Sequence, residues 1–262
     1  MARQKPAVRK RRRADTASSR WLRWLRWLGI AIAGFVVASL FGVLLFRFVD
    51  PPVTPLMMIR LAEGATHWRW VGIDHRSVPL SRVSPALLRS VIAAEDAGFF
   101  RHGGVDWEAL RKARAWNARH AKSGRIRGAS TITMQCARNV FLWQGRTYVR
   151  KALEIWFTWL MEGVWSKRRI LEVYVNVIEW GPGIYGVEAA SRRFFGIPAS
   201  RLDWRQAGLL AAVLPDPLRR NAGTPTAYVE RRATMIARRA ARVRLPADVG
   251  PARRVATASV GW

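Results

Sequence analysis

The chain of 262 residues is 50% hydrophobic and contains 14 tryptophans, a composition that excludes an intrinsically disordered protein. Its formal net charge is +28, and residues 1–26 hold ten Lys or Arg but only one acidic side chain. The remaining +19 belongs to residues 27–262, so we expect an anionic partner: a lipid surface, a phosphate-bearing substrate or nucleic acid. The one cysteine, Cys136, excludes an intramolecular disulfide.

A membrane-spanning helix is predicted near the N-terminus, following a basic tail at residues 1–26. Residues 29–46 carry no charge, and the segment 27–48 reaches the roughly 20 residues that cross a bilayer. A cleaved signal peptide has a shorter apolar region of about 7–15 residues, whereas a buried core helix remains the alternative. Because positive charge precedes the span, we expect a cytoplasmic N-terminus and a chain that lies outside beyond about residue 50.

The rest of the chain is expected to be mainly α-helical, because helix start and stop signals recur and strand patterns are scarce. Residues 49–83 form a linker and membrane-proximal segment, residues 84–245 the main helical domain, and residues 246–262 a C-terminal tail. Residues that suit helix N-caps open several of the predicted helices: Ser84, Asp106, Ser166 and Asp203. The segment Gly181-Pro182-Gly183 is expected to end the helix that begins at Lys167.

An acidic pair, Glu95-Asp96, continues the apolar face of the helix that begins after Ser84. Val91 lies one turn before Glu95, and Ile92 one turn before Asp96, so both carboxylates are predicted to face the core. A carboxylate in an apolar site must be paired, capped or functional, because an isolated buried charge is very costly. From this stretch alone, a structural carboxylate and a catalytic one are equally good interpretations.

Five stretches, taken in order, resemble the glycosyltransferase domain of the peptidoglycan polymerases, the family-51 transglycosylases. The resemblance covers about residues 60–222, and the chain leaves no room for a transpeptidase domain, which favours the monofunctional biosynthetic members over class A penicillin-binding proteins. The stretches are EDAGFFRHGG (95–104), GASTITMQ (128–135), Arg150-Lys151 with Glu154, KRRILEVYVN (167–176), and GVEAASRRFFG with the later AGLLAAVLPDP.

The resemblance implies a lysozyme-like, two-lobed helical domain that polymerises lipid II into β-1,4-linked glycan strands and releases undecaprenyl pyrophosphate. It assigns Glu95 as the general base that activates the attacking sugar hydroxyl. Glu154 would organise the pyrophosphate site, through a divalent cation (Mg²⁺ or Mn²⁺) or by orienting nearby cations. By position alone, Glu154 would instead form an ordinary surface salt bridge with Arg150 and Lys151. No organic cofactor is expected.

The remaining site residues are expected to bind pyrophosphate or to support the catalytic loop. Cations and polar groups at or beside the family's phosphate-contacting positions are Ser130, Thr131, Gln135, Arg138, Arg146, Arg150 and Lys151. Each cation could equally belong to a solvated basic face, and Ser130 and Thr131 could merely cap a helix. The expected supporting residues are Asp96, Phe99, His102, Gly104 and Asn176. Met134 stands where the family usually has a second glutamine, which puts one polar contact in doubt.

The expected setting is the bacterial inner membrane, with one span, a cytoplasmic N-terminus and a periplasmic catalytic domain. Expected partners are lipid II, the growing glycan strand, the membrane and other cell-wall synthesis proteins. A lytic transglycosylase or lysozyme-like enzyme that cleaves peptidoglycan is the main alternative, although a neutral sugar polymer would give the cations near Glu154 no partner. A nucleic-acid binder is disfavoured, because the basic domain is predicted to lie outside the cytoplasm and carries no recognition motif.

Overall fold

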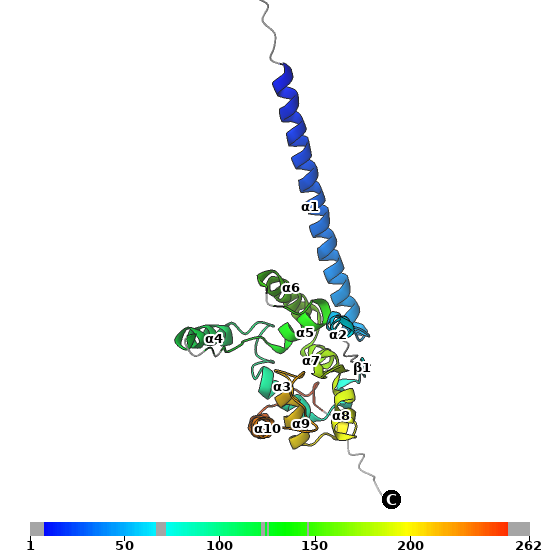
Figure 1. The fold of residues 1–262 in the computed structure, drawn as a ribbon, viewed down its shortest axis with the longest axis vertical. Helices are drawn as coiled ribbons and strands as arrows, with labels where there is room; N and C mark the ends of the chain where they lie inside the picture. The colour runs from blue at the N-terminus through cyan, green and yellow to red at the C-terminus, as the bar shows by residue number, and fades with distance from the viewer. Residues whose placement is uncertain (1–7, 67–71, 122–123, 125, 146, 251–262) are drawn as a thin grey trace, which may run out of the picture. The chain divides into compact units, whose positions relative to one another are not determined.

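The computed structural model describes residues 8–66, 72–121, 124, 126–145 and 147–250. The chain divides into two compact units, residues up to Leu45 and residues from Phe46 onward. The described chain is mainly helical, which confirms the predicted fold class (Figure 1).

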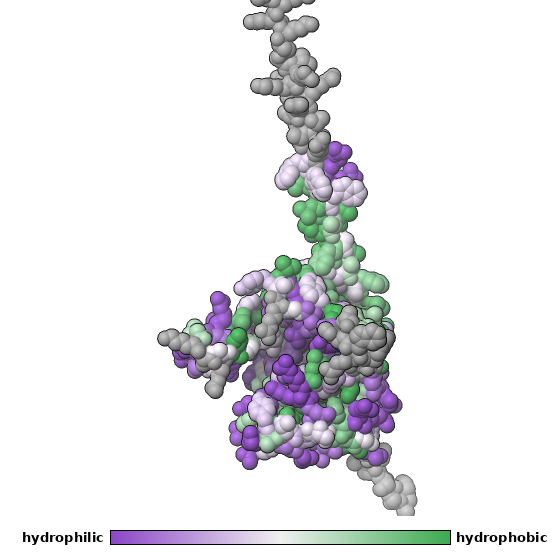
Figure 2. All heavy atoms as spheres, in the orientation of Figure 1, coloured by the Kyte–Doolittle hydropathy of each residue, from purple (hydrophilic) through white to green (hydrophobic). Residues whose placement is uncertain are grey.

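Helix α1 (Val8–Phe48) contains a segment, Trp21–Phe48, that is long and apolar enough to cross a membrane. Its large apolar side chains are exposed, including Trp24 at 72% and Phe41 at 67%, unlike those of a soluble core helix. Figure 2 shows the apolar residues of this segment on the visible surface. Because α1 begins at Val8, the basic segment from residue 8 to 26 continues the same helix, and no structural boundary separates it from the predicted span at residue 27.

The second unit contains two groups of packed helices (Figure 1). One group consists of α3 (Pro85–Glu95), α9 (Trp204–Val213) and α10 (Ala227–Ala240). The other consists of α5 (Ile132–Phe141), α6 (Tyr148–Val164) and α7 (Lys167–Val177), and α2 (Pro55–Thr66) packs against α5. Helix α8 (Val187–Phe195) follows a small sheet, whereas α4 (Trp107–Arg119) stands apart from both groups.

The helices begin where side chains satisfy their free backbone N–H groups. The four predicted N-caps are confirmed: each accepts a hydrogen bond from a backbone N–H of the first helical turn. Asp203 and Gln206 form a complete capping box at the start of α9. Thr131, Thr147 and Thr226 cap α5, α6 and α10 in the same way.

A three-stranded sheet was not predicted. Strand β1 (Asp74–His75) pairs in parallel with β3 (Ile184–Tyr185), which pairs antiparallel with β2 (Glu179–Gly181). The helix from Lys167 therefore ends at Val177, and the Gly-Pro-Gly segment forms the turn between β2 and β3 rather than the helix end. Gly183 has φ +71°, a conformation that favours glycine and permits the tight turn. Two short 3-10 turns, Leu80–Arg82 and Ala199–Arg201, complete the described elements.

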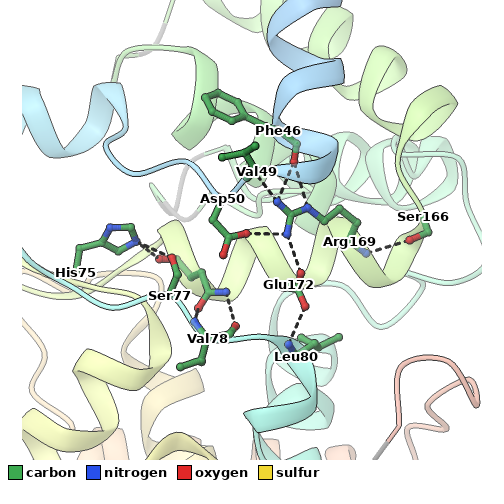
Figure 3. Close-up of polar contacts among 11 residues, drawn as sticks. Phe46, Val49, Asp50, His75, Ser77, Val78, Leu80, Ser166, Arg169 and Glu172 are labelled. Atoms are coloured by element: carbon green, nitrogen blue, oxygen red, sulfur yellow. Dashed lines mark hydrogen bonds and ion pairs between the residues drawn. The ribbon is translucent and has the colours of Figure 1, made fainter. Parts of the chain in front are cut away.

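Polar side chains of α7 hold two segments of the predicted linker (Figure 3). The Asn176 side chain donates to the carbonyl of Val78 at 2.8 Å and accepts from its N–H at 3.2 Å. Glu172 accepts from the N–H of Leu80 at 2.7 Å, while the Arg169 guanidinium donates to Glu172 and to Asp50, both at 2.7 Å. These contacts fix residues 50 and 78–80 of the linker onto α7.

The C-terminal boundary also differs from the predicted one. Residues 246–250 form a turn in which Val249 is only 2% exposed, and Arg168 donates to the backbone carbonyl of Asp248. These residues are therefore packed onto the domain. Residues 251–262 of the predicted tail lie outside the described residues.

Candidate active site

Glu95 ends α3 and is held by a chain of hydrogen bonds that begins in α7. The Tyr174 hydroxyl donates to Oε1 of Gln135 at 3.1 Å, and Nε2 of Gln135 donates to Oε2 of Glu95 at 2.9 Å. Because the tyrosine donates to the amide oxygen, the amide nitrogen must face the carboxylate. Three helices thus fix one oxygen of Glu95.

The surroundings of Glu95 shift its proton affinity. Burial raises the pKa of this carboxyl above the ordinary glutamate value, because the charged form loses solvation. The Gln135 hydrogen bond and the positive charges of Arg232 and Arg138 lower that pKa in part, and the charge of Asp96 raises it. A carboxylate with a raised pKa binds a proton more readily than an exposed glutamate, as a general base must.

Asp96 and His102 shape the loop that follows Glu95. His102 Nε2 lies 3.0 Å from each Asp96 oxygen, and the N–H of Ile132, the first residue of α5, donates to Asp96 at 3.1 Å. Asp96 therefore links the end of α3 to the start of α5. Phe99 is fully buried, and the Lys167 ammonium lies 4.7 Å from the centre of its ring. These contacts hold Asp96, Phe99 and His102 in place after α3, and their supporting roles in catalysis stay a prediction.

Gly104 lets the same loop approach α6 closely. It has φ +86°, and a Cβ at this position would lie 2.6 Å from Thr158 Cγ2 and 2.8 Å from Glu162 Cγ. Its carbonyl accepts a hydrogen bond from Thr131 Oγ1 at 2.5 Å. The same hydroxyl oxygen caps α5 by accepting from the N–H of Met134. Thr131 therefore caps α5, which is the structural alternative to a phosphate contact.

Glu154 lies on α6 and is fully buried, unlike a residue of an ordinary surface salt bridge. Arg150 Nη1 donates to one of its oxygens, and Lys151 Nζ donates to the other at 2.5 Å. Lys151 also reaches Ser130 Oγ at 3.4 Å, at the segment before α5. The buried carboxylate thus orients two cations, and Arg150 Nε has no hydrogen-bond partner among the described residues.

Arg138 extends the positive charge along α5. It lines a pocket of about 170 Å³ together with Gln135 and Tyr174, the two residues that hold Glu95. Its Nε is buried without a hydrogen-bond partner in the described part of the chain. Arg146, which was also expected to contact phosphate, lies outside the described residues.

Helix α5 brings the two expected catalytic regions together. Gln135 on this helix contacts Glu95, whereas Ser130, just before its cap, contacts the Lys151 partner of Glu154. Asn176 lies elsewhere: its side chain is engaged by the backbone of Val78 rather than by this site, so it supports the linker.

The described residues do not build a metal site on their own. No group of three His, Cys, Asp or Glu side chains in the described ranges is arranged to hold a metal ion. Both oxygens of Glu154 already accept from cations. A divalent cation here would need oxygens of a bound pyrophosphate to complete its ligand shell.

Two residues of the site were missed by sequence reasoning. Tyr174 follows the apolar spacing of α7, a pattern that indicates a core residue, so only the contact with Gln135 reveals its second role. Arg232 lies on the basic helix α10, where no spacing distinguishes it from its neighbours. Its charge nevertheless acts on Glu95. Cys136 is fully buried and its thiol pKa is raised by desolvation, as befits a core residue rather than a nucleophile.

Comparison with known proteins identifies one family. A family model described as transglycosylase matches residues 65–241. The chain is 52% identical over 216 residues to the biosynthetic peptidoglycan transglycosylase of Caulobacter vibrioides, covering 82% of this chain and 88% of the relative. It is 50% identical to the protein of the same description from Rhodospirillum centenum, covering 83% and 90%. For the Bdellovibrio bacteriovorus relative the identity is 48%, covering 85% and 88%.

Proposed function

This chain belongs to the transglycosylase family, and we propose that it is a peptidoglycan glycosyltransferase that polymerises lipid II into β-1,4-linked glycan strands. The observation that carries the proposal is the pairing, across α5, of a glutamate of raised pKa with a buried carboxylate that holds two cations. The first suits a base, and the second suits a site for a pyrophosphate leaving group.

In the proposed reaction, Glu95 accepts the proton of the acceptor sugar hydroxyl as its oxygen attacks the anomeric carbon of the lipid-linked donor. The new glycosidic C–O bond forms on the face opposite the leaving group, so the configuration inverts. The bond between the anomeric carbon and the pyrophosphate oxygen breaks, and undecaprenyl pyrophosphate leaves with the bonding electrons.

The leaving pyrophosphate gains negative charge, which fixed cations stabilise. Arg138, Arg150 and Lys151 are the described cations proposed for this role, together with Arg146 from the sequence pattern. Glu154 holds Arg150 and Lys151 in place. Gln135 keeps the base oriented. Ser130 accepts a hydrogen bond from Lys151, which also donates to Glu154.

We place the enzyme in the bacterial inner membrane, with the domain from Phe46 onward in the periplasm. The span Trp21–Phe48 and the positive charges before it support this orientation. Exposed apolar side chains on α2 and α4, such as Met58 and Trp107, each 54% exposed, suit contact with the membrane and the lipid tail of the substrate. Other cell-wall synthesis proteins are the proposed protein partners.

The test uses detergent-solubilised full-length protein with two substrates in parallel. Lipid II should give a glycan polymer, whereas purified sacculi should release no soluble muropeptides. Release of muropeptides without polymerisation of lipid II would support a glycan-cleaving enzyme and overturn the proposal.

A further inference from the structure

A second pocket is lined by residues of α3, of the loop that follows it, and of α10 and the segment after α10. Its volume is about 520 Å³, and four arginines line it. We call it the arginine pocket; it is formed by Arg101, Arg239, Arg242 and Arg244 around Ile92 and Phe100. None of its lining residues is acidic.

The charge of the arginine pocket is uncompensated. None of the four guanidinium groups forms an ion pair with a side chain in the described ranges. Four like charges around one concave surface repel one another, which a bound anion relieves. Guanidinium groups bind planar carboxylates through two parallel N–H···O bonds, and the apolar floor of Phe100 and Ile92 suits aliphatic groups next to such carboxylates.

The position of the pocket limits what can occupy it. Ile92 and Ala93 belong to the last turns of α3, and Ala97 follows Glu95 by two residues, so the pocket is lined by residues within three positions of the proposed catalytic glutamate. Within the second unit, α10 lies at the opposite end from α2 and α6 (Figure 1), and hydrophilic residues predominate on its visible surface (Figure 2). Because α2 follows Phe46 closely in sequence, and the chain leaves the predicted span there, the end that carries α10 does not favour a lipid headgroup.

We propose that the arginine pocket binds the peptide carboxylates of the glycan strand while the strand's sugars lie at Glu95. This inference rests on the proposed function, because only a peptidoglycan strand brings peptide carboxylates to this position. The pocket would hold the strand through charge, and would thereby keep it in register with the base between successive sugar additions.

The test measures binding of a soluble disaccharide–pentapeptide by full-length protein in detergent, using calorimetry. The double variant Arg239→Gln/Arg242→Gln removes two charges of the pocket. The matched control, Arg193→Gln/Arg238→Gln, removes two exposed charges on α8 and α10 outside the pocket. The pocket variant should weaken binding about tenfold, and the control should stay within about twofold of the wild type. Thermal unfolding of both variants checks that they fold.

Three further probes identify the ligand chemistry: the same fragment with amidated carboxylates, inorganic phosphate, and vesicles that contain anionic phospholipid. The amidated fragment should bind the wild type about as weakly as the native fragment binds the pocket variant. The inference is overturned if the wild type does not bind the native fragment, if amidation or the pocket variant has no effect, or if only phosphate or vesicles bind in an arginine-dependent way.

Polymerisation of lipid II by the same wild-type preparation separates this inference from the proposed function. Polymer formation without arginine-dependent binding of the fragment would overturn the inference alone. Arginine-dependent binding without polymer formation would overturn the proposed function alone.

Discussion

At the scale of single residues, the account depends on how Glu95 is buried. Its desolvation raises the pKa of the carboxyl, whereas the Gln135 hydrogen bond and two arginines keep this rise in check. The folded protein therefore binds a proton at pH values where the unfolded glutamate has lost it. Stability falls as pH rises through the window between the ordinary and the raised pKa, and the cost is complete above that window.

Replacing Glu95 by Gln should therefore stabilise the fold at neutral pH, because an amide carries no charge to desolvate. We expect the Tm to rise by about 2–4 °C, the shift that about 1 kcal/mol produces in a domain of this size. The difference from wild type should shrink as pH falls through the window from the raised to the ordinary glutamate pKa. Thermal unfolding as a function of pH checks this; a Tm that is lower in the variant at neutral pH would show that the carboxylate is structural.

Tyr174→Phe tests the hydrogen-bond chain without emptying the core. The ring remains, but the Gln135 amide loses the donor that fixes its orientation. Because the Gln135 contact lowers the pKa of Glu95, its weakening should move the acidic limb of the rate profile to higher pH. We expect a roughly tenfold loss of rate at a pH near that limb. An unchanged pH profile would confine Tyr174 to packing.

Residue type and spacing predicted the acidic pair and the helix caps, since both are local signals. They could not predict which hydroxyls remain free to bind a ligand. The Thr131 hydroxyl, for example, donates to the carbonyl of Gly104, 27 residues away. Tyr174 and Arg232 were missed for the same reason: their contacts with the Glu95 region cross between helices.

At the scale of elements, the loop between α3 and α4 is fixed by its approach to α6. Gly104→Ala should place a methyl group 2.6 Å from Thr158 Cγ2 while keeping a φ of +86°. We expect a destabilisation of about 1–3 kcal/mol and a matching loss of activity, because the loop carries Asp96 and His102. Thermal unfolding and polymerisation assays measure both.

Gly103→Ala is the matched control, because nothing lies within 4 Å of a Cβ at that neighbouring position. It should change the Tm by less than about 1 °C. If the two variants were equally destabilised, the close approach of the loop to α6 would not be the cause.

The boundaries of elements were predicted where a cap or a glycine marks them locally. The sheet was not, because its strands are two or three residues long and β1 pairs with β3 across more than a hundred residues. Such short strands carry no periodicity, so the pairing depends on tertiary contacts. The helix from Lys167 was predicted too long for the same reason: the residues after Val177 serve the sheet.

At the scale of the whole molecule, the proposed span Trp21–Phe48 would determine which compartment receives the domain from Phe46 onward. Single cysteines at Ser18→Cys and Thr224→Cys test this, since Cys136 is buried and has a raised thiol pKa. A membrane-impermeant thiol reagent applied to spheroplasts should label the exposed position 224 and spare position 18. Labelling at position 18 alone would reverse the predicted topology.

The central claim is that Glu95 is the base that drives polymerisation of lipid II. Its most direct test is the initial rate of glycan formation from lipid II by full-length wild type and Glu95→Gln, with the folded fraction of each measured in the same preparation. The account predicts a folded variant whose rate is about 10²–10⁴-fold lower. A folded Glu95→Gln variant that polymerises lipid II at near the wild-type rate would contradict it.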